Sequence, residues 1–131
     1  MRTAVDGAVL VEVFEGVGPR ARASAHALKE AYAAGPLVVN EATLATVRSR
    51  FKSQADFEGA LGALGLRLDP TLLEAATLAG VIWGVHGKHK AKARLEECLL
   101  GAHALVQADR LLTRKGALYK RLCPRLRVLV P

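Results

Sequence analysis

Residues 101–114 read GAHALVQADRLLTR, and this stretch decides the class of fold. It completes an apolar helix predicted over residues 95–108 and leads into a short β-prone run at 110–113. Outward from it, short apolar runs alternate with helical segments along the chain. The predicted strands lie near residues 2–5, 36–39, 110–113 and 126–130, with 66–68 as a further candidate. This alternation predicts an α/β fold with a mainly parallel sheet and helices on both faces.

The helices between these strands are predicted from apolar spacing and from capping residues. Their predicted starts lie at Ala8, Arg20, Asn40, Ser53 and Asp69. Asn40 and Ser53 are good N-cap residues. Asp69-Pro70 is the strongest start, because a capping acid precedes a proline at the first helical position. We find no internal repeat and no linker, so the chain is expected to form one domain over residues 1–131.

The composition points to a cytoplasmic protein. Hydrophobic residues make up 51% of the chain, which is enough to bury a core without disulfide staples. The uncharged apolar stretch at 75–85 is far shorter than the roughly 20 residues that span a bilayer. Acidic residues close to the start argue against a signal peptide. Cys98 and Cys123 do not make a disulfide framework, and we interpret both as reduced thiols.

The net charge of +7 is concentrated in the second half of the chain. Residues 1–60 contain seven basic and seven acidic residues, whereas residues 61–131 contain twelve and five. A first basic cluster consists of Lys88, Lys90, Lys92 and Arg94. A second consists of Arg110, Arg114, Lys115, Lys120, Arg121, Arg125 and Arg127. Segregated positive charge favours a polyanionic partner, and we rank nucleic acid above an acidic protein.

Three motifs resemble those of the PIN-domain nucleases of the VapC toxin type. They are AVDGAVLVEVFEG at 4–16, PLVVNEATLATV at 36–47, and EECLLGAHALVQADRLLTRKGALYKR at 96–121 followed by LRVLVP. The resemblance implies a three-layer PIN-like fold and an endoribonuclease that uses Mg²⁺ or Mn²⁺ to cleave single-stranded RNA. It also implies a toxin paired with an antitoxin protein, and a homodimer.

The family site has four acidic positions, which we carry over one at a time. Asp6 matches the first acid, and Glu97 matches the third with a side chain one methylene longer. Thr46 falls at the second position and lacks a carboxylate, while Lys115 falls at the fourth and reverses the charge. Glu41 precedes Thr46 by five residues, about 140° and about 7.5 Å away on a helix. It should therefore not replace the missing second acid.

The resemblance thus implies that Asp6 and Glu97 are the catalytic, metal-binding acids, with the Thr113 hydroxyl close to the metal. Mg²⁺ is a hard cation that prefers carboxylate oxygen and water. On the residues alone, Asp6 is equally a turn residue beside Gly7. Glu97 is equally an acid in the first turn of a helix, where the helix dipole favours it.

The predicted RNA surface is drawn from the second basic cluster and from the tyrosine within it. The predicted RNA-binding residues are Arg114, Lys115, Tyr119, Lys120, Arg121 and Arg125. Tyr119 is the better candidate for stacking on bases, because Trp83 follows an apolar helical run and should be in the core. We interpret His86 and His89 as a surface loop in preference to a zinc site, since two ligands do not make one. His103 is expected to be packed inside.

Two hypotheses lead, and a third, more remote one is a structural protein whose basic tail contacts an acidic protein. The first is the metal-dependent endoribonuclease. The second is a PIN domain whose metal site has decayed and which binds RNA or a protein without cleavage. Convergence of Asp6 and Glu97 with Lys115 turned away would favour the enzyme. A bond between Lys115 and Asp6 would favour the binding module.

Overall fold

The computed structural model describes residues 1–87 and 93–131. Within them, five strands form one sheet in the order β3-β2-β1-β4-β5, and every neighbouring pair is parallel. The strands are β1 Thr3–Val5, β2 Leu37–Val39, β3 Leu66–Leu68, β4 Arg110–Leu112 and β5 Val128–Leu129. The predicted strands are confirmed, including the one at 66–68, and the last is shorter than expected.

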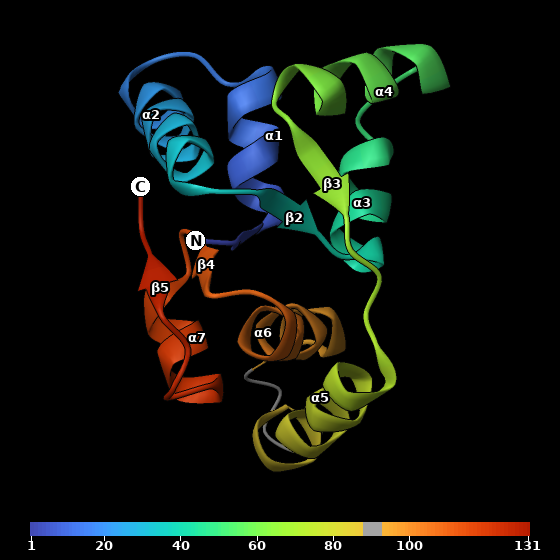
Figure 1. The fold of residues 1–131 in the computed structure, drawn as a ribbon, viewed down its shortest axis with the longest axis vertical. Coiled ribbons are helices and arrows are strands. Elements are labelled where there is room, and N and C mark those ends of the chain that lie inside the picture. Colours follow the sequence, from blue (N-terminus) through green and yellow to red (C-terminus); the bar gives the residue numbers. More distant parts are fainter. Residues whose placement is uncertain (88–92) are drawn as a thin grey trace.

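Helices cover both faces of the sheet, as predicted (Figure 1). The helices are α1 Gly7–Glu15, α2 Pro19–Ala34, α3 Glu41–Arg48, α4 Gln54–Ala63, α5 Leu73–His86, α6 Leu95–Gln107 and α7 Gly116–Leu122. The α1–α4 helices lie on one side of the sheet and α5–α7 on the other. The fold is therefore a three-layer α/β arrangement.

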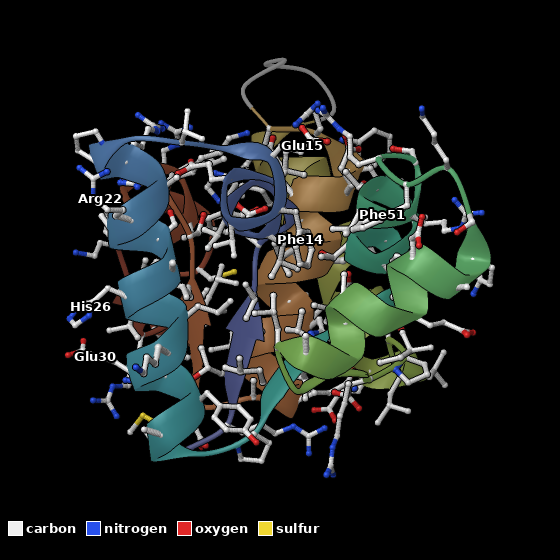
Figure 2. The ribbon with its side chains drawn as sticks, turned by 90° about the horizontal axis from the view of Figure 1, so that it is seen from above. Phe14, Glu15, Arg22, His26, Glu30 and Phe51 are labelled. Atoms are coloured by element: carbon white, nitrogen blue, oxygen red, sulfur yellow. The ribbon has the colours of Figure 1, made fainter. Side chains whose placement is uncertain are left out.

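Alternation along each strand explains why the sheet has two cores. Val5 and Leu37 pack with the α1–α4 layer, whereas Ala4 and Val38 pack with the α5–α7 layer. Successive side chains in a strand point to opposite faces, so both sets are buried only if both faces are covered. On the first side, Phe14 of α1 and Phe51 meet edge to face with ring centroids 5.4 Å apart (Figure 2).

Two predicted N-caps are confirmed and one is wrong. The Asn40 and Ser53 side chains accept bonds from the amides of Thr43 and Asp56, at the starts of α3 and α4. Asp69 does not cap α5, which begins four residues later at Leu73. The Asp69 amide instead donates to the Val39 carbonyl at 2.8 Å and prolongs the pairing of β3 with β2.

The Asp69 carboxylate binds residues distant in the sequence and does not cap the start of α5. One oxygen lies 2.9 Å from His103 Nε2, and the other lies 3.1 Å from an Arg2 guanidinium nitrogen. His103 is fully buried, so the prediction that it is packed inside is confirmed. Trp83 packs against the core, also as predicted.

Helix α7 was not predicted from the sequence. This seven-residue helix follows β4 and packs Tyr119 and Leu122 into the core. The predictions about His89 and about Lys88, Lys90 and Lys92 concern residues that lie outside the described ones. None of the helices within the described residues has the length and hydropathy that crossing a membrane requires.

Candidate functional site

A pocket of about 380 Å³ lies at the carboxyl ends of β1 and β4. Ligand sites in parallel sheets form at this edge, where the strands end and the following helices begin. The pocket is lined by Asp6, Gly7, Ala8, Val11, Glu12, Ala42, Thr43, Thr46, Arg50, Arg94, Glu96, Glu97, Leu100, Lys115 and Tyr119. The four positions carried over from the PIN motifs therefore lie around one cavity, although they are 109 residues apart from first to last.

Asp6 follows β1 directly and has two structural bonds. Its Oδ1 accepts a bond from the Ala8 amide at 3.4 Å, which makes Asp6 the N-cap of α1. Its Oδ2 accepts a bond from the Thr113 hydroxyl at 2.7 Å. Thr113 is fully buried, and its hydroxyl oxygen accepts a bond from the Lys115 amide at 3.0 Å. The turn after β4 is thus tied to the end of β1.

Glu97 lies in the first turn of α6 and is almost fully buried. Its Oε1 accepts a bond from the Arg94 amide at 2.9 Å, and its Oε2 accepts one from Lys115 Nζ at 2.8 Å. Burial by itself raises the pKa of Glu97. The hydrogen bonds from Lys115 and Arg94, with the charges of both residues, outweigh burial and hold the pKa below its ordinary value.

Lys115 points into the pocket, where it binds Glu97 rather than Asp6. The structure therefore combines features of both hypotheses, because the two acids share one pocket but one of them holds a lysine. The Lys115 side chain remains 45% exposed, so its ammonium reaches both the carboxylate and solvent. An ion pair occupies the place where the PIN motifs position a fourth acid.

Thr46 also lines the pocket, in agreement with its carried-over position, but its hydroxyl donates to the Ala42 carbonyl at 3.0 Å. Glu41 is not among the lining residues. Its Oε2 accepts a bond from the Thr71 amide at 2.8 Å, at the connection between β3 and α5. The prediction that Glu41 does not replace the second acid is confirmed.

Solved structures resemble this arrangement over almost the whole chain. VapBC2 from Rickettsia felis bound to a DNA fragment from its promoter matches with a TM-score of 0.72 and 14% identity, covering 99% of this chain and 98% of that chain. A toxin–antitoxin complex from Klebsiella pneumoniae matches with a TM-score of 0.69 and 18% identity, covering 97% and 95%. The fold is PIN-like. The predicted resemblance to VapC-type PIN domains is thereby confirmed for the fold.

The sequence of the chain matches no protein-family model and no curated protein. At 14% and 18% identity, the two structures establish the arrangement of helices and strands but not the chemistry of the pocket.

The pocket of this PIN-like fold does not fit a divalent cation in its present arrangement. Mg²⁺ takes oxygen ligands in a near-octahedral shell. Among the described residues, no group of three or more His, Cys, Asp or Glu side chains is placed to hold a metal ion. The oxygens of Asp6 and Glu97 accept bonds from Ala8, Thr113, Arg94 and Lys115. The Lys115 ammonium already supplies one positive charge beside Glu97.

A second polar network at the pocket edge was not predicted. Glu12 of α1 binds the Ser24 hydroxyl at 2.9 Å, Arg114 at 3.2 Å and Arg20 at 3.3 Å. Burial raises the pKa of Glu12, but the bonds from Ser24, Arg114 and Arg20 outweigh it and lower the pKa. The sequence held no signal for this network, because the partners come from separate elements.

Two of the predicted RNA-binding residues, Arg114 and Tyr119, are mostly covered in the structure. The Arg114 guanidinium also donates to the carbonyls of Arg20 and Pro131, and its side chain is only 19% exposed. Tyr119 is 1% exposed, and its ring packs beside Gly101 of α6. The prediction that Tyr119 stacks on bases is therefore wrong, because both faces of its ring are covered. Burial likewise raises the pKa of its hydroxyl.

Proposed function

We propose that the protein is a VapC-like PIN-fold domain that binds single-stranded RNA without cleaving it. The observation that carries the proposal is the 2.8 Å bond between Lys115 Nζ and Glu97 Oε2. The Lys115 ammonium neutralises one of the two acids carried over from the motifs, and the described residues place no group of three or more His, Cys, Asp or Glu side chains where it could hold a metal ion. This is the second of the two hypotheses drawn from the sequence.

The proposed RNA surface lies on α7 and on the segment that leads into β5. Lys120 and Arg121 of α7 are exposed, as are Arg125 and Arg127. Within residues 1–87 and 93–131, none of these four side chains forms an ion pair with an acid. Because Lys115, the N-cap of α7, lines the pocket, a bound strand would pass from the basic surface across the pocket mouth.

The test is a fluorescence anisotropy titration of labelled single-stranded RNA at several salt concentrations. In a plot of log binding constant against log salt concentration, each phosphate contact on a single strand contributes about 0.7 to the steepness of the slope, because it releases counterions. Arg121→Glu combined with Arg125→Glu should weaken binding strongly and reduce that slope. Arg22→Glu combined with Lys29→Glu makes the same charge change on exposed positions of α2 and should have a much smaller effect. Equal losses from both pairs would refute the assigned surface.

A metal-dependent endoribonuclease is the second candidate function. Asp6, Thr46 and Glu97 line one pocket at the carboxyl ends of the strands, which is the position of the acidic site that the resemblance implies. Strong Mn²⁺-dependent cleavage of single-stranded RNA by the wild type, lost in Asp6→Ala, would favour this function over simple binding.

The same fold likeness supports a protein partner. The Klebsiella protein was solved in a toxin–antitoxin complex. By analogy of fold alone, we propose an antitoxin protein as a partner of this chain. We also propose a cytoplasmic location, which the free thiols of Cys98 and Cys123 support.

A further inference from the structure

Asp6 is the one acid of the pocket lining that forms no ion pair within residues 1–87 and 93–131. The other three lining acids are each paired: Glu12 with Arg20 and Arg114, Glu96 with Arg94, and Glu97 with Lys115. The Asp6 Oδ1 accepts a long 3.4 Å bond from the Ala8 amide, and its Oδ2 accepts one from the Thr113 hydroxyl. Since each carboxylate oxygen can accept two bonds, Asp6 keeps a negative charge and free acceptor positions for a ligand.

Tyr119 also lines the pocket, although its side chain is only 1% exposed. None of the described residues exchanges a hydrogen bond with its hydroxyl. Burial and the nearby charges of Asp6 and Glu97 raise the pKa of this hydroxyl, so it keeps its proton and remains a donor. A buried donor without a partner costs free energy, and native structures rarely contain one. A buried donor beside an unpaired acid therefore indicates a site for a polar ligand.

The remainder of the pocket suits a flat, uncharged ligand. Its apolar lining comes from α1, α3 and α6: Ala8, Val11, Ala42 and Leu100. Its volume of about 380 Å³ lies at the lower end of the range for small-molecule sites. A phosphate would be repelled by the unpaired Asp6 carboxylate, whereas a neutral base would not. A strand held by its phosphates on the exposed basic surface would therefore turn a base into the pocket.

We propose that the pocket receives one guanine base of the bound RNA strand. Among the RNA bases, only guanine has two adjacent donors on its Watson–Crick edge, N1–H and the 2-amino group. A carboxylate accepts such a pair through its two oxygens, and Asp6 would take this role. The neighbouring O6 of guanine is an acceptor, which the Tyr119 hydroxyl and the Lys115 ammonium can serve as donors. Lys115 uses one of its N–H groups on Glu97 and keeps the others.

Thr113 fixes these groups relative to one another. Its hydroxyl donates to Asp6 Oδ2 at 2.7 Å and accepts from the Lys115 amide at 3.0 Å. The acceptor and one of the donors are thus attached to the same buried side chain. The inference rests on the proposed RNA binding and deepens it, since it names the base that the pocket selects.

RNA strands of equal length test the assignment by fluorescence anisotropy. One is oligouridine, and another has a single central guanosine in the same sequence. Their phosphates are equal in number, so the basic surface should give both the same salt dependence. The wild type should bind the guanosine strand about tenfold more tightly, which is within the range for a bidentate base contact. Inosine at the same position lacks only the 2-amino group and should lose most of this gain.

Variants of the pocket test the assigned contacts. Asp6→Asn replaces one acceptor oxygen by an amide donor and is still a favoured N-cap residue, so the variant should fold. It should bind the guanosine and inosine strands equally. Tyr119→Phe should lower the preference for guanosine over uridine. Asp56→Asn is the matched control, because Asp56 is an exposed acid in the first turn of α4, outside the pocket lining, and it should keep the full preference.

The outcomes separate the guanine site from the RNA surface. Equal, salt-sensitive binding of the uridine and guanosine strands by the wild type would overturn the guanine site alone. A guanosine preference that survives in Asp6→Asn would also overturn it. Arg121→Glu with Arg125→Glu should weaken binding of both strands and leave their ratio unchanged. If neither strand binds to the wild type, the proposed RNA binding fails, and the guanine site fails with it.

Discussion

The substitution Lys115→Asp tests whether Lys115 keeps divalent cations out of the pocket. It removes the ammonium that lies 2.8 Å from Glu97 Oε2 and places a carboxylate at the same backbone position. The local charge changes by two units. Lys115 is the N-cap of α7 and makes no side-chain capping bond, whereas aspartate is a favoured N-cap residue. The variant should therefore fold.

The expected change in Mn²⁺ affinity follows from the geometry of the ion pair between Lys115 and Glu97. A cation bound by Glu97 would lie about 4 Å from the ammonium, where each unit of charge is repelled by about 1 kcal/mol in water and about 4 kcal/mol at an effective dielectric of 20. Because the Lys115 side chain is 45% exposed, the lower part of this range applies. About 1.4 kcal/mol changes an affinity tenfold. Mn²⁺ affinity should rise about tenfold or more.

Calorimetric titration with Mn²⁺ measures this change. Adding Thr46→Glu to Lys115→Asp should raise the affinity further, although the two substitutions border one site and need not be additive. Single-stranded RNA cleavage should appear or increase in this double variant. Asp6→Ala in the same background should remove the gain.

Lys120→Asp is the matched control, since it makes the same charge change on an exposed position of α7. It should leave Mn²⁺ affinity nearly unchanged. No gain in Mn²⁺ affinity from Lys115→Asp, or the same gain from Lys120→Asp, would show that Lys115 does not keep cations out of the pocket. No gain from either Lys115→Asp or Thr46→Glu would mean that the residue-by-residue comparison with the PIN motifs is misaligned.

Three further predictions concern the ion pair, the core and a helix cap. Bonds from Lys115 and Arg94 hold the pKa of Glu97 low in the folded protein. They therefore stabilise the fold at pH values above the unfolded pKa of about 4.3, and this stabilisation is lost as the pH falls through the folded pKa. Lys115→Ala should raise the Glu97 pKa measured by carboxyl NMR titration, and an unchanged pKa would contradict the assigned cause. Tyr119→Ala should lose about 3–5 kcal/mol of stability in urea unfolding, whereas Tyr119→Phe should bind RNA that lacks guanine as the wild type does. Asn40→Ala should cost about 0.5–2 kcal/mol through loss of the bond to the Thr43 amide, and a change within error would argue against this cap.

The sequence by itself determined the class of fold. Short β-prone runs such as Thr3–Val5 and Leu37–Val39 are separated by helical segments, and this alternation predicts strands of a parallel sheet that is covered on both faces. Local capping chemistry located the starts of α3 and α4, because the side chains of Asn40 and Ser53 accept bonds from amides only three residues further along the chain. The changes at Thr46 and Lys115 were also visible in the sequence, since they alter charge at positions that the motifs define.

Only the tertiary structure decided what those side chains contact. Lys115 finds its partner Glu97 on another helix, 18 residues earlier in the chain, and nothing in local spacing distinguishes Glu97 from Asp6 as the acceptor. Asp69 is a strong local helix start, yet long-range bonds to His103 and Arg2 override that preference. A side chain's direction depends on which neighbouring elements offer a partner or a space, and that is settled only when the strands have brought those elements together.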